Sequence, residues 1–186
     1  MGREHDLYLP SGSVSLLSCP RGIHGGGPGT VNRIYVRVIE GTGFISKAIS
    51  FSTRSWGTHA EFIYVSSKSG LWVTYGARED GVHLRPADYC KPKRQEWFEF
   101  PGADKALLHA ATQENSRYDF SAIFGLGIDR DWREVGRWFC SELIAWAFEE
   151  CGQPIFDPEV KVWRVTPRDL LLARNKRKVE PYALAA

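Results

Sequence analysis

The chain has 186 residues, of which 43% are hydrophobic and 25% charged, a composition typical of one soluble globular domain. Its formal net charge of +2 is too small to indicate nucleic-acid binding, so we expect no nucleic-acid partner. The cysteines form no Cys-x-x-Cys pair and no other metal-ligand spacing is present, so we predict no metal site and no cofactor. No apolar run is long enough to be a transmembrane segment.

The N-terminal residues 1–31 are predicted to form a flexible or extended arm. Residues 25–29 read Gly-Gly-Gly-Pro-Gly, which neither a helix nor a strand tolerates. The apolar segment earlier in the arm is interrupted by Pro10, Ser11 and Gly12, whereas a signal peptide needs about 7–15 continuous apolar residues. The sequence therefore contains no convincing signal peptide.

Residues 32–175 are predicted to form a single α+β domain, followed by a basic C-terminal tail at residues 176–186. Apolar alternation and β-branched residues predict about five strands, mostly antiparallel, at residues 34–39, 59–65, 71–75, 82–85 and 95–100. Three- and four-residue apolar spacing predicts helices at residues 44–51, 104–115, 118–124 and 140–151, and a last helix that begins after Thr166. Because most strands precede most helices, we expect a sheet packed on helices.

His59 begins one of these strands. Successive side chains of a strand point to opposite faces, so His59 and Glu61 are expected to project together from one face. Ala60 and Phe62 belong to the other face. An imidazole and a carboxylate are thus predicted at one end of a strand.

Cys140 begins the helix predicted at residues 140–151. The unpaired N–H groups and the dipole of a helix N-terminus favour an anion, which is a setting that lowers a thiol pKa. An imidazole beside such a thiol makes it a nucleophile, and the two residues need not be close in sequence. Cys140 and His59 are therefore a candidate catalytic pair; the competing interpretation is a buried structural cysteine at the start of a core helix.

Three segments resemble a known family. They are Ser-Trp-Gly-Thr-His-Ala-Glu at residues 55–61, Tyr-Asp-Phe-Ser-Ala-Ile at 118–123 and Trp-Phe-Cys-Ser-Glu-Leu at 138–143. Together they resemble the circularly permuted NlpC-type papain-like cysteine hydrolases, the YiiX/YebB-like group related to lecithin retinol acyltransferase. In that branch the His strand precedes the Cys helix, as here. The amino-acid sequence of these segments is also similar to that of bacteriophage and prophage members. The resemblance covers roughly residues 34–172 and implies a permuted papain-like fold.

A third residue is expected to orient the His59 ring. Glu61 is the first choice, because it shares the face of His59. In many relatives the third member is a Glu on the following strand, but that strand here offers Tyr75 and Gly76, so the family pattern is broken; Tyr75 and Glu79 are the alternatives. Tyr118 resembles the tyrosine that borders the oxyanion site in this family. Glu61 as a solvated carboxylate and Tyr118 as a half-buried core residue stay open as alternatives.

The resemblance implies a thiol hydrolase that cleaves an amide or ester bond, foremost a cell-wall peptidoglycan peptidase or amidase. One alternative is a lipid acyl hydrolase or acyltransferase. Another is a non-catalytic phage virion or assembly protein that retains the fold and contacts phage structural proteins through its N-terminal arm. The expected location is cytoplasmic or virion-associated.

Overall fold

The computed structural model describes residues 33–66, 69–122 and 136–180, so the predicted N-terminal arm lies outside the described residues. Six strands form one sheet in the order β4-β3-β2-β1-β5-β8, and every neighbouring pair is antiparallel. The strands are β1 (Arg33–Glu40), β2 (His59–Val65), β3 (Trp72–Arg78), β4 (Gly81–Pro86), β5 (Arg94–Glu99) and β8 (Arg177–Val179).

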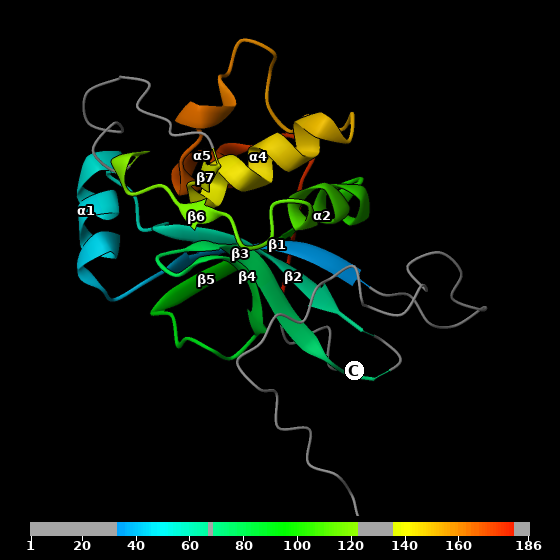
Figure 1. The fold of residues 1–186 in the computed structure, drawn as a ribbon, viewed down its shortest axis with the longest axis horizontal. Helices are drawn as coiled ribbons and strands as arrows, with labels where there is room; N and C mark the ends of the chain where they lie inside the picture. The colour runs from blue at the N-terminus through cyan, green and yellow to red at the C-terminus, as the bar shows by residue number, and fades with distance from the viewer. Residues whose placement is uncertain (1–32, 67–68, 123–135, 181–186) are drawn as a thin grey trace, which may run out of the picture.

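Helices cover one face of this sheet. Figure 1 shows α2, α4 and α5 above the strands, with α1 beside one end of the sheet. This arrangement confirms the predicted α+β class with a mostly antiparallel sheet. Within the described residues, no helix combines the length and apolar character needed to cross a membrane. The helices are α1 (Phe44–Thr53), α2 (Ala103–Ala111), α4 (Cys140–Glu150) and α5 (Pro167–Leu172), with a 3₁₀ turn, η2, at Val162–Arg164.

The two faces of the sheet bury different clusters. Ala60 and Phe62 of β2 belong to the main core between the sheet and the helices, where Phe62 packs 6.1 Å from the ring of Phe148 in α4. Ile63 and Val65 of the same strand belong to a second cluster. Side chains of β2 therefore alternate between the faces as predicted, which puts Glu61 on the face away from the helices.

Two elements differ from the prediction. Residues 177–179, which fall in the predicted basic tail, form the edge strand β8 against β5. The reason is local: Val179 packs on the second cluster, Arg177 pairs with Glu99, and Lys178 Nζ lies 3.3 Å from Glu96 Oε1. The prediction of a tail rests on its charges alone, whereas complementary charges on a neighbouring strand attach part of it to the sheet.

Tyr118 also lies in a different element from the one predicted. It belongs to the short strand β6 (Arg117–Tyr118), which pairs in parallel with β7 (Arg137–Trp138), and not to a helix. The amide of Asp119 donates to the carbonyl of Trp138 at 3.0 Å. This pairing places Tyr118 beside Trp138, which precedes Cys140 by two residues in the chain that leads into α4.

Candidate active site

The beginning of β2 is held by its neighbours. The Thr58 amide donates to the Ile39 carbonyl at 2.9 Å, and the Thr58 hydroxyl accepts from the Gly41 amide at 2.9 Å. A Cβ on Gly57 would lie 3.0 Å from a methyl of Val38, so the chain approaches β1 closely there. His59 therefore begins the strand at a point where hydrogen bonds and close packing hold the backbone against β1.

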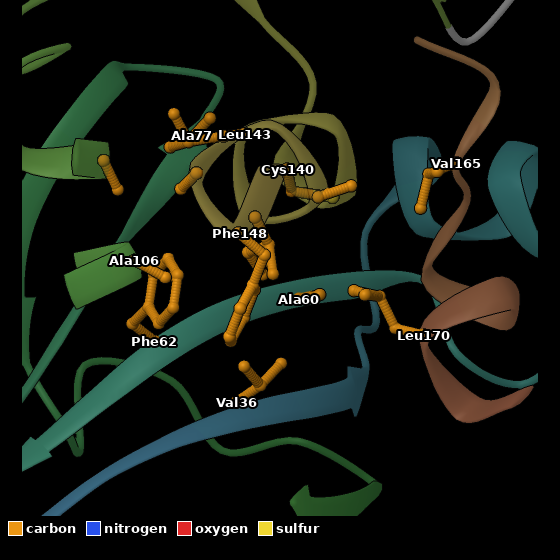
Figure 2. Close-up of a cluster of buried hydrophobic side chains, with 14 of the residues drawn as sticks. Val36, Ala60, Phe62, Ala77, Ala106, Cys140, Leu143, Phe148, Val165 and Leu170 are labelled. Atoms are coloured by element: carbon orange, nitrogen blue, oxygen red, sulfur yellow. The ribbon is translucent and has the colours of Figure 1, made fainter. Parts of the chain in front are cut away.

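Cys140 is the first residue of α4 and is fully buried in the main core. Figure 2 shows it among buried apolar side chains, in the same cluster as Ala60 of β2. The backbone amides of Ala60 and Ser141 act on the sulfur and favour its ionised form. The thiol thus lies at the N-terminal end of α4 and against the peptide unit that follows His59.

The pKa of Cys140 is raised, whereas its position at a helix N-terminus predicted that it would be lowered. Complete burial raises the pKa of the thiol to about 12, although hydrogen bonds from Ala60 and Ser141 and the charge of Arg78 act to lower it. The removal of the thiolate from water outweighs the N-terminal dipole, because complete burial disfavours the charged form more strongly than one helix end favours it. At neutral pH Cys140 is therefore a thiol.

The structure brings His59 and Glu61 together. His59 Nε2 lies 3.3 Å from Glu61 Oε2, and both side chains are almost fully buried. This is the contact that a shared strand face predicts. The burial of Glu61, which is 1% exposed, contradicts the alternative interpretation that it is a solvated carboxylate.

Glu61 is held by two further residues. The Arg37 guanidinium on β1 donates from Nε to Oε1 at 2.8 Å and forms a buried ion pair with the same carboxylate. The Tyr89 hydroxyl donates to Oε2 at 2.8 Å. Oε2 therefore serves both Tyr89 and His59, while Oε1 serves Arg37, and the carboxylate has one defined orientation.

These contacts set the charges of the pair. Burial lowers the pKa of His59 below its ordinary value, against the opposing effect of Glu61. Burial by itself raises the pKa of Glu61, but the hydrogen bond from His59 and the Arg37 charge outweigh it and bring the pKa to about 2. At neutral pH the imidazole is therefore neutral and the carboxylate is ionised.

The two alternative third members lie elsewhere. Tyr75 is buried on the helix face, and its hydroxyl donates to the Ala110 carbonyl in α2 at 3.3 Å. Glu79 is exposed beyond the end of β3. A Cβ at Gly76 would lie 3.1 Å from the Cβ of Glu61, so a larger residue there would crowd the Glu61 side chain. The space of a side chain on β3 is occupied by Glu61 itself.

Tyr118 is 5% exposed, so it is more deeply buried than either interpretation of its sequence predicts. Burial raises its pKa well above the ordinary value, and the charge of Cys140 is the next largest cause, so the two side chains are electrostatic neighbours. Tyr118 also lines a cavity of about 280 Å³ together with Glu79, Phe120 and Arg137. Tyr118 is therefore a neighbour of the Cys140 thiol and also part of the wall of this cavity.

The candidate residues are divided between the two faces of β2. His59 and Glu61 share the face away from the helices, whereas Cys140 lies on the helix face in the same cluster as Ala60. Within the described residues the His59 ring is hydrogen-bonded to Glu61, and the Cys140 thiol makes no hydrogen bond to that ring. Neither side chain of the candidate pair is open to solvent in the described part of the chain, since Cys140 is 0% and His59 6% exposed.

Three residues around the site were not anticipated from the sequence: Arg37, Arg78 and Tyr89. Arg37 did carry a signal, because a charged residue stands at an alternate position of a strand that is otherwise apolar and β-branched. Tyr89 carried none, since it follows β4 in an irregular segment and reaches Glu61 only through the fold. Arg78 is located by the pairing of β3 with β2.

The fold has a counterpart among solved structures, although no protein-family model and no curated protein matches the chain. The crystal structure of the metalloprotein YiiX from Escherichia coli O157:H7, assigned to DUF1105, is similar with a TM-score of 0.58 and 16% sequence identity. The match covers 78% of this chain and 94% of that chain.

YiiX is described as a metalloprotein, which raises the question of a metal site in this chain. Within residues 33–66, 69–122 and 136–180, no three or more His, Cys, Asp or Glu side chains are grouped so that they would hold a metal ion. The donor set of the described site therefore does not fit a metal centre. A likeness at this level of identity concerns the fold, and the fold of this chain is YiiX-like.

Proposed function

We propose that the chain is a thiol hydrolase that cleaves an amide or ester bond. The observation that carries the proposal is the buried His59–Glu61 pair at the beginning of β2, the strand against which the Cys140 thiol packs. Cys140 is the nucleophile, His59 transfers its proton, and Glu61 orients the imidazole. A YiiX-like fold supports the proposal, because it is compatible with a papain-like hydrolase.

The protonation states determine how the first step proceeds. Glu61 engages Nε2 of His59, which leaves Nδ1 to accept the thiol proton. Because the resting pair is a neutral thiol and a neutral imidazole, proton transfer to Nδ1 accompanies the attack of sulfur on the carbonyl carbon. The bond from sulfur to carbon forms and the carbonyl oxygen takes the electron pair. Arg37 and Tyr89 keep Glu61 ionised and oriented, so the imidazolium is stabilised as it appears.

The later steps use the same groups. His59 returns the proton to the leaving amine or alcohol as its bond to the carbonyl carbon breaks, which yields a thioester on Cys140. Water then attacks the thioester while His59 accepts a proton from it. The carbon–sulfur bond breaks, the carboxylic acid leaves, and His59 returns the proton to the sulfur, which restores the thiol. Amides of the first turn of α4 that lack intrahelical acceptors and the Tyr118 hydroxyl are the candidate donors to the oxyanion.

We propose peptide bonds of peptidoglycan as the first substrates to test. Purified peptidoglycan fragments are incubated with the protein, and products are identified by chromatography and mass spectrometry. Cys140→Ser and His59→Gln should each lower the rate by about three orders of magnitude or more. Cys151→Ser is the matched control, because Cys151 follows the other end of the same helix and its variant should retain full activity.

The outcome separates the candidate functions. Hydrolysis that survives Cys140→Ser would contradict the proposed nucleophile. A wild-type protein that cleaves neither peptidoglycan fragments nor simple esters would favour a virion or assembly protein that keeps the fold without the chemistry.

A second candidate function, acyl transfer or hydrolysis at a lipid surface, is favoured by α1. Phe44 and Phe51 are 85% and 88% exposed and lie seven residues apart, which puts them on one side of the helix. Exposed aromatic pairs of this kind fit a lipid interface. Sedimentation with phosphatidylcholine–phosphatidylglycerol vesicles tests this: wild type should bind and the Phe44→Ser/Phe51→Ser variant should not, while absence of wild-type binding would exclude the surface function.

A further inference from the structure

Arg78 is the last residue of β3 and lies across the sheet from His59. The register pairs Phe62 with Tyr75, and counting on along these antiparallel strands brings Arg78 opposite His59. The two side chains therefore project from the same face at the same end of the sheet. Arg78 is partly buried, so its guanidinium is neither in bulk water nor enclosed.

The guanidinium of Arg78 has no acceptor of its own in the described part of the chain. Its carbon lies 4.7 Å above the centre of the Tyr89 ring, which positions it, but no hydrogen bond or ion pair within residues 33–66, 69–122 and 136–180 involves it. Two nearby arginines differ: Arg37 is bound to Glu61, and Arg85 is bound to Asp80 and to three backbone carbonyls. A guanidinium carries five N–H donors in a planar fork, so those of Arg78 are available to a ligand.

The position of this charge is central to the candidate site. Arg78 acts electrostatically on the Cys140 thiol, on the His59 ring and on the Tyr118 hydroxyl, and lowers the pKa of each. These three side chains come from α4, β2 and β6. By geometry Arg78 is a cation opposite His59 in the sheet, and the Tyr89 ring beneath it is tied through its hydroxyl to Glu61.

We propose that Arg78 binds an anionic group of the substrate, a carboxylate close to the carbonyl that Cys140 attacks. This rests on the proposed function and narrows it to amides or esters whose acyl part carries a negative charge beside the scissile bond. A planar carboxylate matches the guanidinium fork with two parallel N–H···O bonds, which gives both affinity and orientation. The competing explanation is that Arg78 only packs on Tyr89 and adjusts the charge of the thiol.

Alkylation with two reagents of nearly equal size separates these explanations. Iodoacetate carries a carboxylate where iodoacetamide carries a neutral amide. A change in the fraction of Cys140 thiolate alters both rates equally. The ratio of the iodoacetate rate to the iodoacetamide rate therefore reports contact with the carboxylate of the reagent. The rate at each cysteine of the folded protein is measured by peptide mass spectrometry, and the ratio at Cys140 is divided by the ratio at Cys151.

In the wild type the normalised ratio should be about ten, since a hydrogen bond between two charged groups is about twice as strong as one between neutral groups. Arg78→Gln should bring it close to one, and Arg78→Lys should restore part of it. Arg94→Gln is the matched control, because Arg94 also lies over an aromatic ring, at 4.1 Å from that of Trp56, but is paired with Glu96. Its ratio should equal that of the wild type.

The results that overturn the proposal are distinct from those that overturn the hydrolase function. A wild-type normalised ratio near one removes the anion site without any variant, and so does a high ratio that survives in folded Arg78→Gln protein. In either case, labelling of Cys140 and hydrolysis that depends on it would leave the hydrolase function standing. If neither reagent labels Cys140 in the folded protein, the nucleophile and the anion site fall together.

Discussion

The two faces of the sheet are stabilised in different ways. The face under the helices is apolar: Phe62, Leu143 and Phe148 are each fully buried and belong to one hydrophobic cluster. The opposite face buries charge, with Arg37 and Glu61 paired and Tyr89 and His59 bound to the same carboxylate. Strand β2 contributes to both faces because its side chains alternate.

This difference explains why Cys140 and Glu61 ionise so differently although both are buried. Cys140 belongs to the apolar face, where burial outweighs the hydrogen bonds to the thiol and raises its pKa. Glu61 has a hydrogen bond or a charge on each oxygen, and its pKa falls to about 2. Burial by itself does not determine the charge of a side chain; the number of partners that favour the charged form does.

The largest expected effect comes from breaking the charged network on one side. Glu61→Gln leaves the buried Arg37 without its carboxylate, so we expect a loss of about 3–5 kcal/mol of unfolding free energy at pH 7. Urea denaturation followed by circular dichroism measures it. The double variant Arg37→Met/Glu61→Gln, which removes the uncompensated charge, should be more stable than the single one; equal stability would mean that the unpaired charge of Arg37 is not the cause of the loss.

The second effect is a dependence of stability on pH that the apolar face does not share. The pKa of Glu61 is lowered to about 2 from 4.5, so its stabilisation is fully present above pH 4.5 and is lost as the pH falls toward 2. His59, whose pKa is also lowered, adds a loss of stability as the pH falls below 6.5. Urea midpoints measured between pH 7 and pH 3 should fall accordingly.

Ile144→Val, on the apolar face, provides the comparison for that measurement. Its cost of about 0.5–1.5 kcal/mol should be the same at each pH, because no titratable group is removed. A destabilisation by Glu61→Gln that is equally independent of pH would show that Glu61 is not the group responsible.

A smaller effect is expected from the tyrosine on the charged face. Tyr89→Phe removes a hydrogen bond to an ionised carboxylate and should cost about 1.5–3 kcal/mol. Because Glu61 then loses one of its partners, the activity that depends on Cys140 should decline at a higher pH on its acid side than in the wild type. An unchanged pH–rate profile would show that Tyr89 does not position Glu61 for catalysis.

The smallest effect is expected from the tyrosine on the helix face. Tyr75→Phe removes the neutral hydrogen bond to the Ala110 carbonyl and should cost about 0.5–1.5 kcal/mol. The rate of hydrolysis and its pH profile should not change, since Tyr75 points away from His59. A substantial loss of rate in folded Tyr75→Phe protein would make Tyr75 the third member in place of Glu61.

The local patterns of the sequence were sufficient for the secondary structure and for one contact of the site. The alternation of β2 predicted that Ala60 and Phe62 face the helices and that His59 and Glu61 project together, and the structure confirms both. The apolar stripe that begins at Cys140 predicted α4. These properties follow from backbone geometry. The direction of side chains repeats every 2 residues in a strand and every 3.6 in a helix, so neighbouring positions in the sequence are enough to predict it.

Properties that depend on distant parts of the chain were not predictable in this way. The pKa of Cys140, the partners Arg37 and Tyr89 of Glu61, and the attachment of β8 all arise from residues far apart in sequence. A helix N-terminus indicates a low thiol pKa only while the thiol keeps contact with water, and burial is a result of packing. The sequence thus specified which residues project together within an element, and the packing of the elements determined their charge.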